Sequence, residues 1–278
     1  MQNSRITTFK LKDMKTRGEK IAVLTCYDYS TAKMLDEAGI EVLLVGDSLG
    51  MVVLGYDSTI PVTMEDMLIH TKAVSRGAKN AMVVADMPFM SYQVSVEDSV
   101  RNAGRFLQEG GANAVKLEGG REITRIIKAI DDAGIPVMGH LGLTPQSINK
   151  LGGYRVQGRD EAAGRRMLNN ALALQDAGVF AIVLECIPAP LAKIISERID
   201  IPVIGIGAGV GCDGQVLVIH DMLGLYTTVS PKFAKKYADL HSVILEAVGR
   251  YSSDVKEQRF PGPEHSFDLH ETELGKLY

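Results

Sequence analysis

Polar and acidic residues follow several short apolar segments of this sequence, at the point where each segment ends. Asp47 and Ser48 come just after the run VLLV, and Asp86 ends the next apolar run. Glu118 and Glu185 end two later runs in the same way. Carboxylates gathered at one place repel each other unless a cation lies among them. Oxygen ligands without a Cys or His pair at ligand spacing favour a hard ion, and Mg²⁺ leaves positions open for a substrate.

The apolar runs recur along the chain with one design. Each is short and rich in β-branched residues, and each has polar residues or glycine at its C-terminal end. Continuous apolar runs of this kind are typical of parallel strands that are buried on both faces. The eight runs are 20–28, 42–48, 81–89, 113–120, 135–142, 180–188, 201–209 and the weaker 215–223.

Helical patterns lie between these runs. Ile123, Ile126, Ile127 and Ile130 recur at the spacing of one helix face. Capping-box pairs, Thr63 with Asp66 and Ser95 with Asp98, predict two helix starts, and the segments DEAGI, QEGGA, DDAGI and QDAGV each predict a helix that ends at glycine. Strand and helix repeated about eight times predict a (β/α)8 TIM barrel, an α/β fold; a doubly wound open sheet is the alternative.

The barrel fills the chain as one domain over 1–278. We expect an N-terminal helical segment over 1–19, a barrel core over 20–229, and a closing helix and tail over 230–278. The helix itself is predicted over 230–259, and the tail is expected to pack on a neighbouring subunit.

In parallel barrels the C-terminal ends of the strands meet at one mouth. Asp47, Asp86 and Glu118 are therefore candidate metal ligands, although loop carboxylates that cap helices are the alternative for any one of them. Lys116 precedes Glu118 by two residues, so both face the same side of their strand. It is expected to bind a substrate carboxylate; snorkelling outward between helices and Schiff-base chemistry are the other interpretations.

Glu185 is left as the candidate general base, because a partly desolvated Glu can remove a proton beside a carbonyl. His140 competes for that role or orients another group. Ser48 is a candidate hydrogen-bond donor to substrate. The segment 205–209, GIGAG, is either a phosphate-binding loop or a tight turn, and Cys186 is interpreted as a packed thiol.

Composition excludes several classes of protein. A net charge of −4 and a pI near 5.9 argue against a nucleic-acid partner. No apolar run has the length of a membrane span, and the N-terminus lacks the apolar core of a signal peptide. Three cysteines without metal-like spacing suit a reducing compartment, so the protein is expected in the cytoplasm. The glycine-rich segment 141–157 is expected to lie as a mobile loop over one end of the barrel.

The same residues carry a resemblance to a known family. From about residue 5 to 267 the sequence is similar to ketopantoate hydroxymethyltransferases (3-methyl-2-oxobutanoate hydroxymethyltransferases). The motifs that carry it, in chain order, are TCYDYSTAKMLDEAGIEVLLVGDSLGMVVLGYDSTIPVTMEDML, ADMPFMSY, AVKLEGG, GHLGLTPQS, GGYRVQGR, LECIP and IGIGAGVGCDGQVLVIHDMLG.

The resemblance implies a barrel related to the phosphoenolpyruvate/pyruvate superfamily. It also implies transfer of a one-carbon unit from 5,10-methylenetetrahydrofolate to 3-methyl-2-oxobutanoate through a Mg-bound enolate, giving 2-dehydropantoate for pantothenate and coenzyme A synthesis. Asp47, Asp86 and Glu118 fall on the family's Mg²⁺-associated positions, some acting through water. The family forms decamers of two pentameric rings, or pentamers of dimers. The residues on its remaining positions are Asp47, Ser48, Asp86 and Lys116 for substrate binding and Glu185 as proton acceptor.

Two rival functions stay open at this stage. One is a Mg²⁺-dependent lyase of the same superfamily, which cleaves a carbon–carbon bond. Such lyases commonly use a cysteine in a mobile loop, and 141–157 contains no cysteine. The other is a non-catalytic metabolite-binding barrel, which would not need an acid cluster with a spare glutamate.

Overall fold

Eight parallel strands form a closed barrel in sequence order. The computed structural model describes residues 5–226, 231–269, 273 and 276. Because β1 pairs with both β2 and β8, the sheet has no open edge, which confirms the predicted TIM barrel and excludes the open sheet. The strands are β1 (Ile21–Thr25), β2 (Val42–Val45), β3 (Met82–Asp86), β4 (Ala114–Glu118), β5 (Val137–Gly142), β6 (Ala181–Glu185), β7 (Val203–Ile206) and β8 (Gly214–Leu217).

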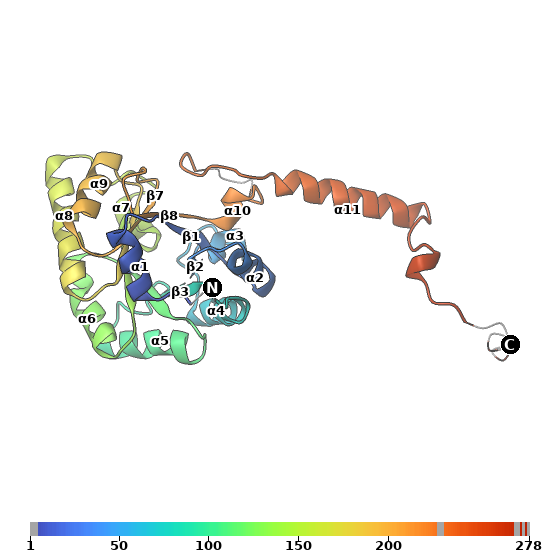
Figure 1. The fold of residues 1–278 in the computed structure, drawn as a ribbon, viewed down its shortest axis with the longest axis horizontal. Coiled ribbons are helices and arrows are strands. Elements are labelled where there is room, and N and C mark those ends of the chain that lie inside the picture. The colour runs from blue at the N-terminus through green and yellow to red at the C-terminus, as the bar shows by residue number, and fades with distance from the viewer. Residues whose placement is uncertain (1–4, 227–230, 270–272, 274–275, 277–278) are drawn as a thin grey trace.

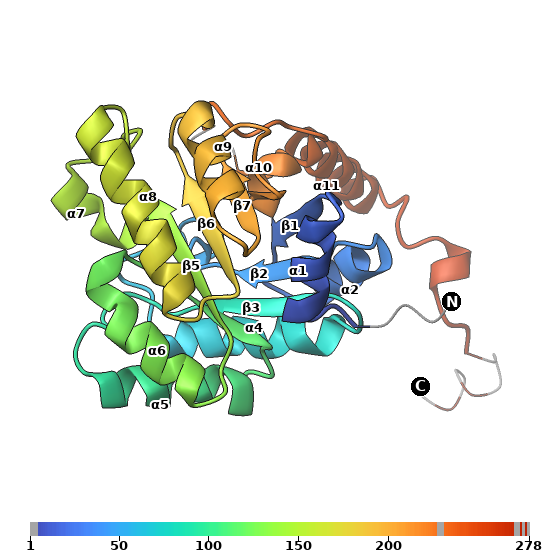
Figure 2. The same cartoon turned by 60° about the vertical axis from the view of Figure 1, so that its left-hand side comes forward.

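Helices surround most of the barrel (Figure 2). The longer ones are α1 (Thr8–Thr16), α2 (Tyr29–Glu37), α4 (Met64–Gly77), α5 (Val96–Gln108), α6 (Thr124–Asp132), α8 (Glu161–Asp176), α9 (Ala189–Arg198) and α11 (Leu240–Lys256). The short ones are α3 (Leu49–Val52), α7 (Ile148–Leu151), α10 (Ile219–Met222) and the 3-10 turns η1 (Arg121–Ile123), η2 (Pro145–Ser147) and η3 (Pro263–His265).

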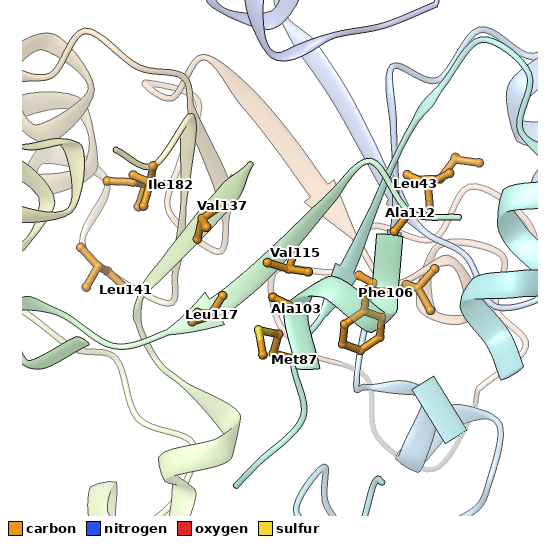
Figure 3. Packing of buried hydrophobic residues seen from close by; sticks show 14 of the residues in the cluster. Leu43, Met87, Ala103, Phe106, Ala112, Val115, Leu117, Val137, Leu141 and Ile182 are labelled. Carbon is orange, nitrogen blue, oxygen red and sulfur yellow. The ribbon is translucent and has the colours of Figure 1, made fainter. Parts of the chain in front are cut away.

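The strand residues alternate between two hydrophobic clusters, which explains the continuous apolar runs. Residues such as Val115 point outward and pack with helix residues such as Phe106 (Figure 3). Residues such as Val84 and Ala114 point inward, and Leu11 and Met14 of α1 join this inner cluster. Burying both faces of each strand removes apolar surface from water, which is the dominant favourable term in folding.

Local sequence signals position the helices. Thr63 and Asp66 form the predicted reciprocal capping box at the start of α4. Ser95 accepts a hydrogen bond from the Asp98 N–H at the start of α5, so the predicted helix start is confirmed, but without the reciprocal backbone bond of a full capping box. The four glycines of the predicted helix ends adopt positive φ, as the left-handed turn after a helix requires; they are Gly39, Gly111, Gly134 and Gly178.

The C-terminal helix differs from the prediction. α11 begins at Leu240 rather than at residue 230, because backbone hydrogen bonds from Tyr237 and Leu240 tie the preceding segment to Met222 and Leu223 near α10. No residue of α11 is buried, and the helix extends away from the barrel instead of closing it (Figure 1). Residues 1–4, 227–230 and parts of the predicted tail lie outside the described residues. No helix among the described residues combines the length and apolar character needed to cross a membrane.

Asp36 connects the end of α2 to the chain just before β3. Its carboxylate accepts hydrogen bonds from the backbone N–H groups of Asn80, at 2.8 Å, and Ala81, at 2.7 Å. The Asn80 side chain donates a further one at 3.0 Å. Burial by itself would raise the pKa of Asp36, but these hydrogen bonds outweigh it and hold the pKa below its ordinary value.

Asp36→Asn should lower the free energy of unfolding at pH 7 by about 1–3 kcal/mol, because an amide nitrogen then faces hydrogen-bond donors. Urea unfolding followed by circular dichroism measures this. Since the folded-state pKa is depressed, the wild-type advantage is present above the unfolded pKa and should shrink as the pH falls below about 4. Asp176→Asn, at the exposed end of α8, is the control. An equal loss in both variants would contradict the assigned role.

Candidate active site at the C-terminal ends of the strands

A cavity of about 470 Å³ opens at the C-terminal ends of the strands. Its size is ordinary for a small-molecule site. It brings together every site residue predicted from the sequence, from strands far apart in the chain. These residues are Asp47, Ser48, Asp86, Lys116, Glu118, His140 and Glu185.

Lys116 lies inside the barrel. In β4 the side chains of Ala114 and Lys116 face inward while Val115 and Leu117 pack outward. The Lys116 Nζ atom lies 3.0 Å from Asp86 Oδ1, and each side chain is only 5% exposed. The expectation that Lys116 faces the carboxylates is therefore confirmed, and the outward-snorkelling interpretation is wrong.

The charge state of Lys116 follows from its surroundings. Burial alone would lower its pKa, but Asp86, Glu118 and Asp47 outweigh burial and hold the pKa above its ordinary value. A permanently protonated amine is a good partner for an anion and a poor nucleophile, which argues against Schiff-base chemistry.

Asp47 and Asp86 form the most crowded part of the site. The Asp47 N–H donates to Asp86 Oδ2 at 3.1 Å. Burial raises the pKa of Asp47 well above its ordinary value, and repulsion from Asp86 and Glu118 adds to the effect. Burial also raises the pKa of Asp86, against the opposing effect of Lys116. Both carboxylates would be stabilised as anions by a further positive charge.

His140 connects the two glutamates. Its Nδ1 atom lies 3.3 Å from Glu118 Oε1 and 3.1 Å from Lys116 Nζ, and its Nε2 atom lies 3.2 Å from Glu185 Oε2. Burial and Lys116 lower the pKa of His140, but Glu118 and Glu185 outweigh them and raise it to about 9. The ring lies between the two glutamates, with a nitrogen within ion-pair distance of each, so this geometry favours the orienting role over that of a base.

Ser48 and Glu185 are the more accessible groups. The Glu185 side chain is 16% exposed, against 3% for Glu118. Gly142 adopts a φ of +98°, and a Cβ there would collide with the Glu185 carbonyl, so only glycine lets β5 approach β6 this closely. The Ser48 Oγ lines the cavity and is hydrogen-bonded to Tyr27 Oη at 2.8 Å.

Chemically, the carboxylates fit a hard dication. Asp47, Asp86 and Glu118 supply oxygen donors only, and their mutual repulsion is the kind that a cation removes. Among the described residues, no group of three or more His, Cys, Asp or Glu side chains already surrounds one point as metal ligands do. Glu118 instead contacts His140 and the Gln146 backbone N–H. This arrangement suits an ion held directly by two aspartates and more loosely by the glutamate.

Two residues of the site were missed by sequence reasoning. Gln146 donates from Nε2 to Asp47 Oδ2 at 2.9 Å, and Tyr92 donates to Gln146 Oε1 at 2.8 Å. Neither ends a strand, so the rule that found the carboxylates did not find them. Gln146 lies in the segment 141–157, and Tyr154 and Arg155 of that segment also line the cavity.

The remaining expectations concern Cys186 and the glycine loop. Burial and Glu185 raise the pKa of the Cys186 thiol to about 11, so the thiol is neutral. Cys186 is only half-buried and lines the cavity, so its interpretation as a packed thiol is not confirmed. Gly207 and Gly209 both adopt positive φ, and the Gly209 carbonyl accepts a hydrogen bond from Gln215. This geometry favours the tight-turn interpretation of the loop.

Solved structures with the same fold include enzymes of other activities. Phosphonopyruvate hydrolase superposes with a TM-score of 0.62 at 12% identity, over 97% of this chain and 94% of that one. Oxaloacetate acetylhydrolase, in complex with 3,3-difluorooxalacetate, superposes with a TM-score of 0.60 at 12% identity, over 97% of this chain and 93% of that one. At this identity the likeness concerns the fold alone.

Sequence comparison is more specific. A protein of Carboxydothermus hydrogenoformans named 3-methyl-2-oxobutanoate hydroxymethyltransferase is 63% identical over 274 residues, covering 99% of each chain. The protein of that name from Enterococcus faecalis is 58% identical over 278 residues, covering 100% of each. The sequence pattern described as ketopantoate hydroxymethyltransferase matches residues 5–263. The chain therefore belongs to the ketopantoate hydroxymethyltransferase family.

Proposed function

We propose that this enzyme transfers a hydroxymethyl group from 5,10-methylenetetrahydrofolate to 3-methyl-2-oxobutanoate, giving 2-dehydropantoate for pantothenate and coenzyme A synthesis. Family membership supports hydroxymethyl transfer. The observation that carries the mechanism is the position of Glu185, a fourth carboxylate that faces the same cavity but lies across His140 from Glu118.

Asp47 and Asp86 would hold a Mg²⁺ ion directly, with Glu118 acting through water. When bound, Mg²⁺ supplies Lewis-acid stabilisation of negative charge on the keto oxygen of the substrate. The ion also offsets the repulsion among the three carboxylates. Because the oxo acid would bind to this ion, Asp47 and Asp86 contribute to substrate binding as well as to metal binding.

Lys116 and Ser48 would bind the substrate carboxylate. The Lys116 ammonium is held at a fixed place by its ion pair with Asp86, so it binds an anion without first being ordered. Ser48 is held in the same way by Tyr27. The apolar side chains that line the cavity beside Glu185, among them Val183 and Ile206, suit the branched hydrocarbon part of the substrate.

Glu185 would remove the proton from C3 of the oxo acid. The electron pair left on C3 then forms the new bond to the methylene carbon of the folate. Both bonds from that carbon to the folate nitrogens break, and one water molecule supplies the hydroxyl group that stays on the transferred carbon. The two nitrogens take up the proton removed from C3 and the remaining proton of the water, so tetrahydrofolate leaves. His140 holds the Glu185 carboxylate through its Nε2 atom, at 3.2 Å, and so directs the other oxygen to the substrate. Partial burial next to apolar side chains is the setting in which a glutamate serves as a base.

Glu185→Gln should lower kcat by about 10²–10⁴-fold, the usual contribution of a general base, and leave KM little changed. Proton NMR in D₂O measures deuterium exchange at C3 of 3-methyl-2-oxobutanoate without folate. We expect exchange that requires Mg²⁺ in the wild type and is lost in the variant. Glu161→Gln, on the surface of α8, is the control. Exchange at the wild-type rate in Glu185→Gln would rule out this base.

Asp47→Asn should weaken Mg²⁺ binding more than about 100-fold, because loss of outer partners alone typically weakens metal binding 10–100-fold. Isothermal calorimetry with metal-free protein measures the affinity, and chelation of the wild-type enzyme should abolish turnover reversibly. Asp176→Asn is the control. An unchanged titration would remove Asp47 from the metal site.

The proposal also includes a homo-oligomer, with a decamer as the expected state. The apolar stripe of α11, formed by Ile244, Val248, Tyr251 and Val255, is exposed to solvent. Ala22 of β1 and Gln215 of β8 are exposed on the outside of the barrel, where a parallel barrel is normally covered by a helix. The stripe of one copy covering such a surface on another copy would bury both.

Ile244→Asp combined with Val248→Asp should therefore dissociate the assembly into smaller species, measured by light scattering coupled to size exclusion. Charges in an apolar contact have a large desolvation cost. Arg250→Asp, on a different face of α11, should leave the assembly intact. An unchanged mass in the double variant would exclude the stripe from the interface.

A further inference from the structure

Gln146 lies at the centre of the hydrogen bonds that surround the carboxylates. It is only 5% exposed and belongs to η2, in the segment that follows β5. Its side chain donates to Asp47 Oδ2 at 2.9 Å, and its backbone N–H donates to Glu118 Oε2 at 3.0 Å. One residue therefore contacts two of the proposed metal-associated carboxylates, from strands that are not neighbours.

The orientation of the Gln146 carboxamide is determined by its other partners. The Met87 carbonyl lies 2.9 Å from Nε2 and can only accept, so the amide nitrogen must face that way. Tyr92 Oη lies 2.8 Å from Oε1 and donates to it. With one N–H directed to Met87, the second N–H is directed to Asp47.

A carboxamide suits this place because it is neutral. A lysine or arginine at this position would neutralise the carboxylates and compete with a bound cation. A glutamine occupies one oxygen of Asp47 and leaves the net negative charge of the cluster in place. Asp47 Oδ1 then remains for an ion, and the rotation of the carboxylate is restricted.

We infer that Gln146 is a positioning residue, which orients Asp47 and Glu118 for metal binding and ties the cavity-lining segment 143–158 to the same carboxylates. The inference rests on the proposed Mg²⁺ site. Tyr154 and Arg155, of the same segment, line the cavity mouth. An ion that orders the carboxylates therefore also orders the segment that borders the substrate.

Gln146→Met, which keeps the size of the side chain and removes the donor, tests the inference. Mn²⁺ alone is titrated into metal-free protein and the free ion is measured by electron paramagnetic resonance. We expect the Kd for Mn²⁺ to rise about 10–100-fold, as for other outer-shell partners. Hydrogen exchange of 143–158 should slow on Mn²⁺ binding in the wild type and respond less in the variant. Unchanged or tighter Mn²⁺ binding would overturn the inference.

Two more variants make the result specific. Gln93→Met is the matched control. Exposed Gln93 donates to Gln146 Oε1 at 3.4 Å and accepts from the Tyr92 backbone N–H at 3.3 Å, and it contacts no carboxylate in the described structure. Its Mn²⁺ affinity should be unchanged, and a loss equal to that of Gln146→Met would overturn the inference. Tyr92→Phe removes the hydroxyl that fixes the carboxamide; a smaller loss is expected, and it replaces Gln146→Met if that variant does not fold. Failure of the wild type to bind Mn²⁺ would instead contradict the proposed metal site.

Discussion

Negative charge gathered out of water at one end of the barrel is the constraint on which the rest of the site depends. Asp47, Asp86 and Glu118 are buried together; burial raises the pKa of Asp47, and repulsion from the other two carboxylates raises it further. Lys116 offsets part of this charge by its ion pair with Asp86, and His140 offsets a further part by its contact with Glu118. The residual excess of negative charge is what would suit this mouth to the proposed dication.

Closure of the barrel makes such a cluster possible. Several strands that carry polar residues near their C-terminal ends are brought side by side, while most of their other residues are apolar on both faces. The inner cluster and α1 fill the opposite end, so the polar groups lie over apolar side chains. Low local dielectric strengthens each interaction among them and increases the cost of leaving any of them unpaired.

The four carboxylates of the cavity differ in their surroundings. Asp47, Asp86 and Glu118, at the ends of β2, β3 and β4, all interact electrostatically with Lys116. The more exposed Glu185, on β6, contacts His140. The segment after β5 adds Gln146 to the first group and side chains to the cavity mouth. In the proposed mechanism, metal binding, substrate binding and proton removal would fall on the ends of β2 to β6, whose polar groups contact one another.

Much of this was determined by the sequence alone. Apolar runs that end in polar residues predicted the strands, the barrel and the set of facing carboxylates. This was possible because the pattern of apolar and polar residues that marks a buried strand and its end is local in the sequence. Only the tertiary structure decided which of these side chains contact each other. His140 contacting both glutamates, and Gln146 contacting Asp47 from 99 residues away, depend on the register of separate strands. The start of α11 was missed because backbone hydrogen bonds to the α10 region, rather than helix propensity, decide the course of the residues just before it.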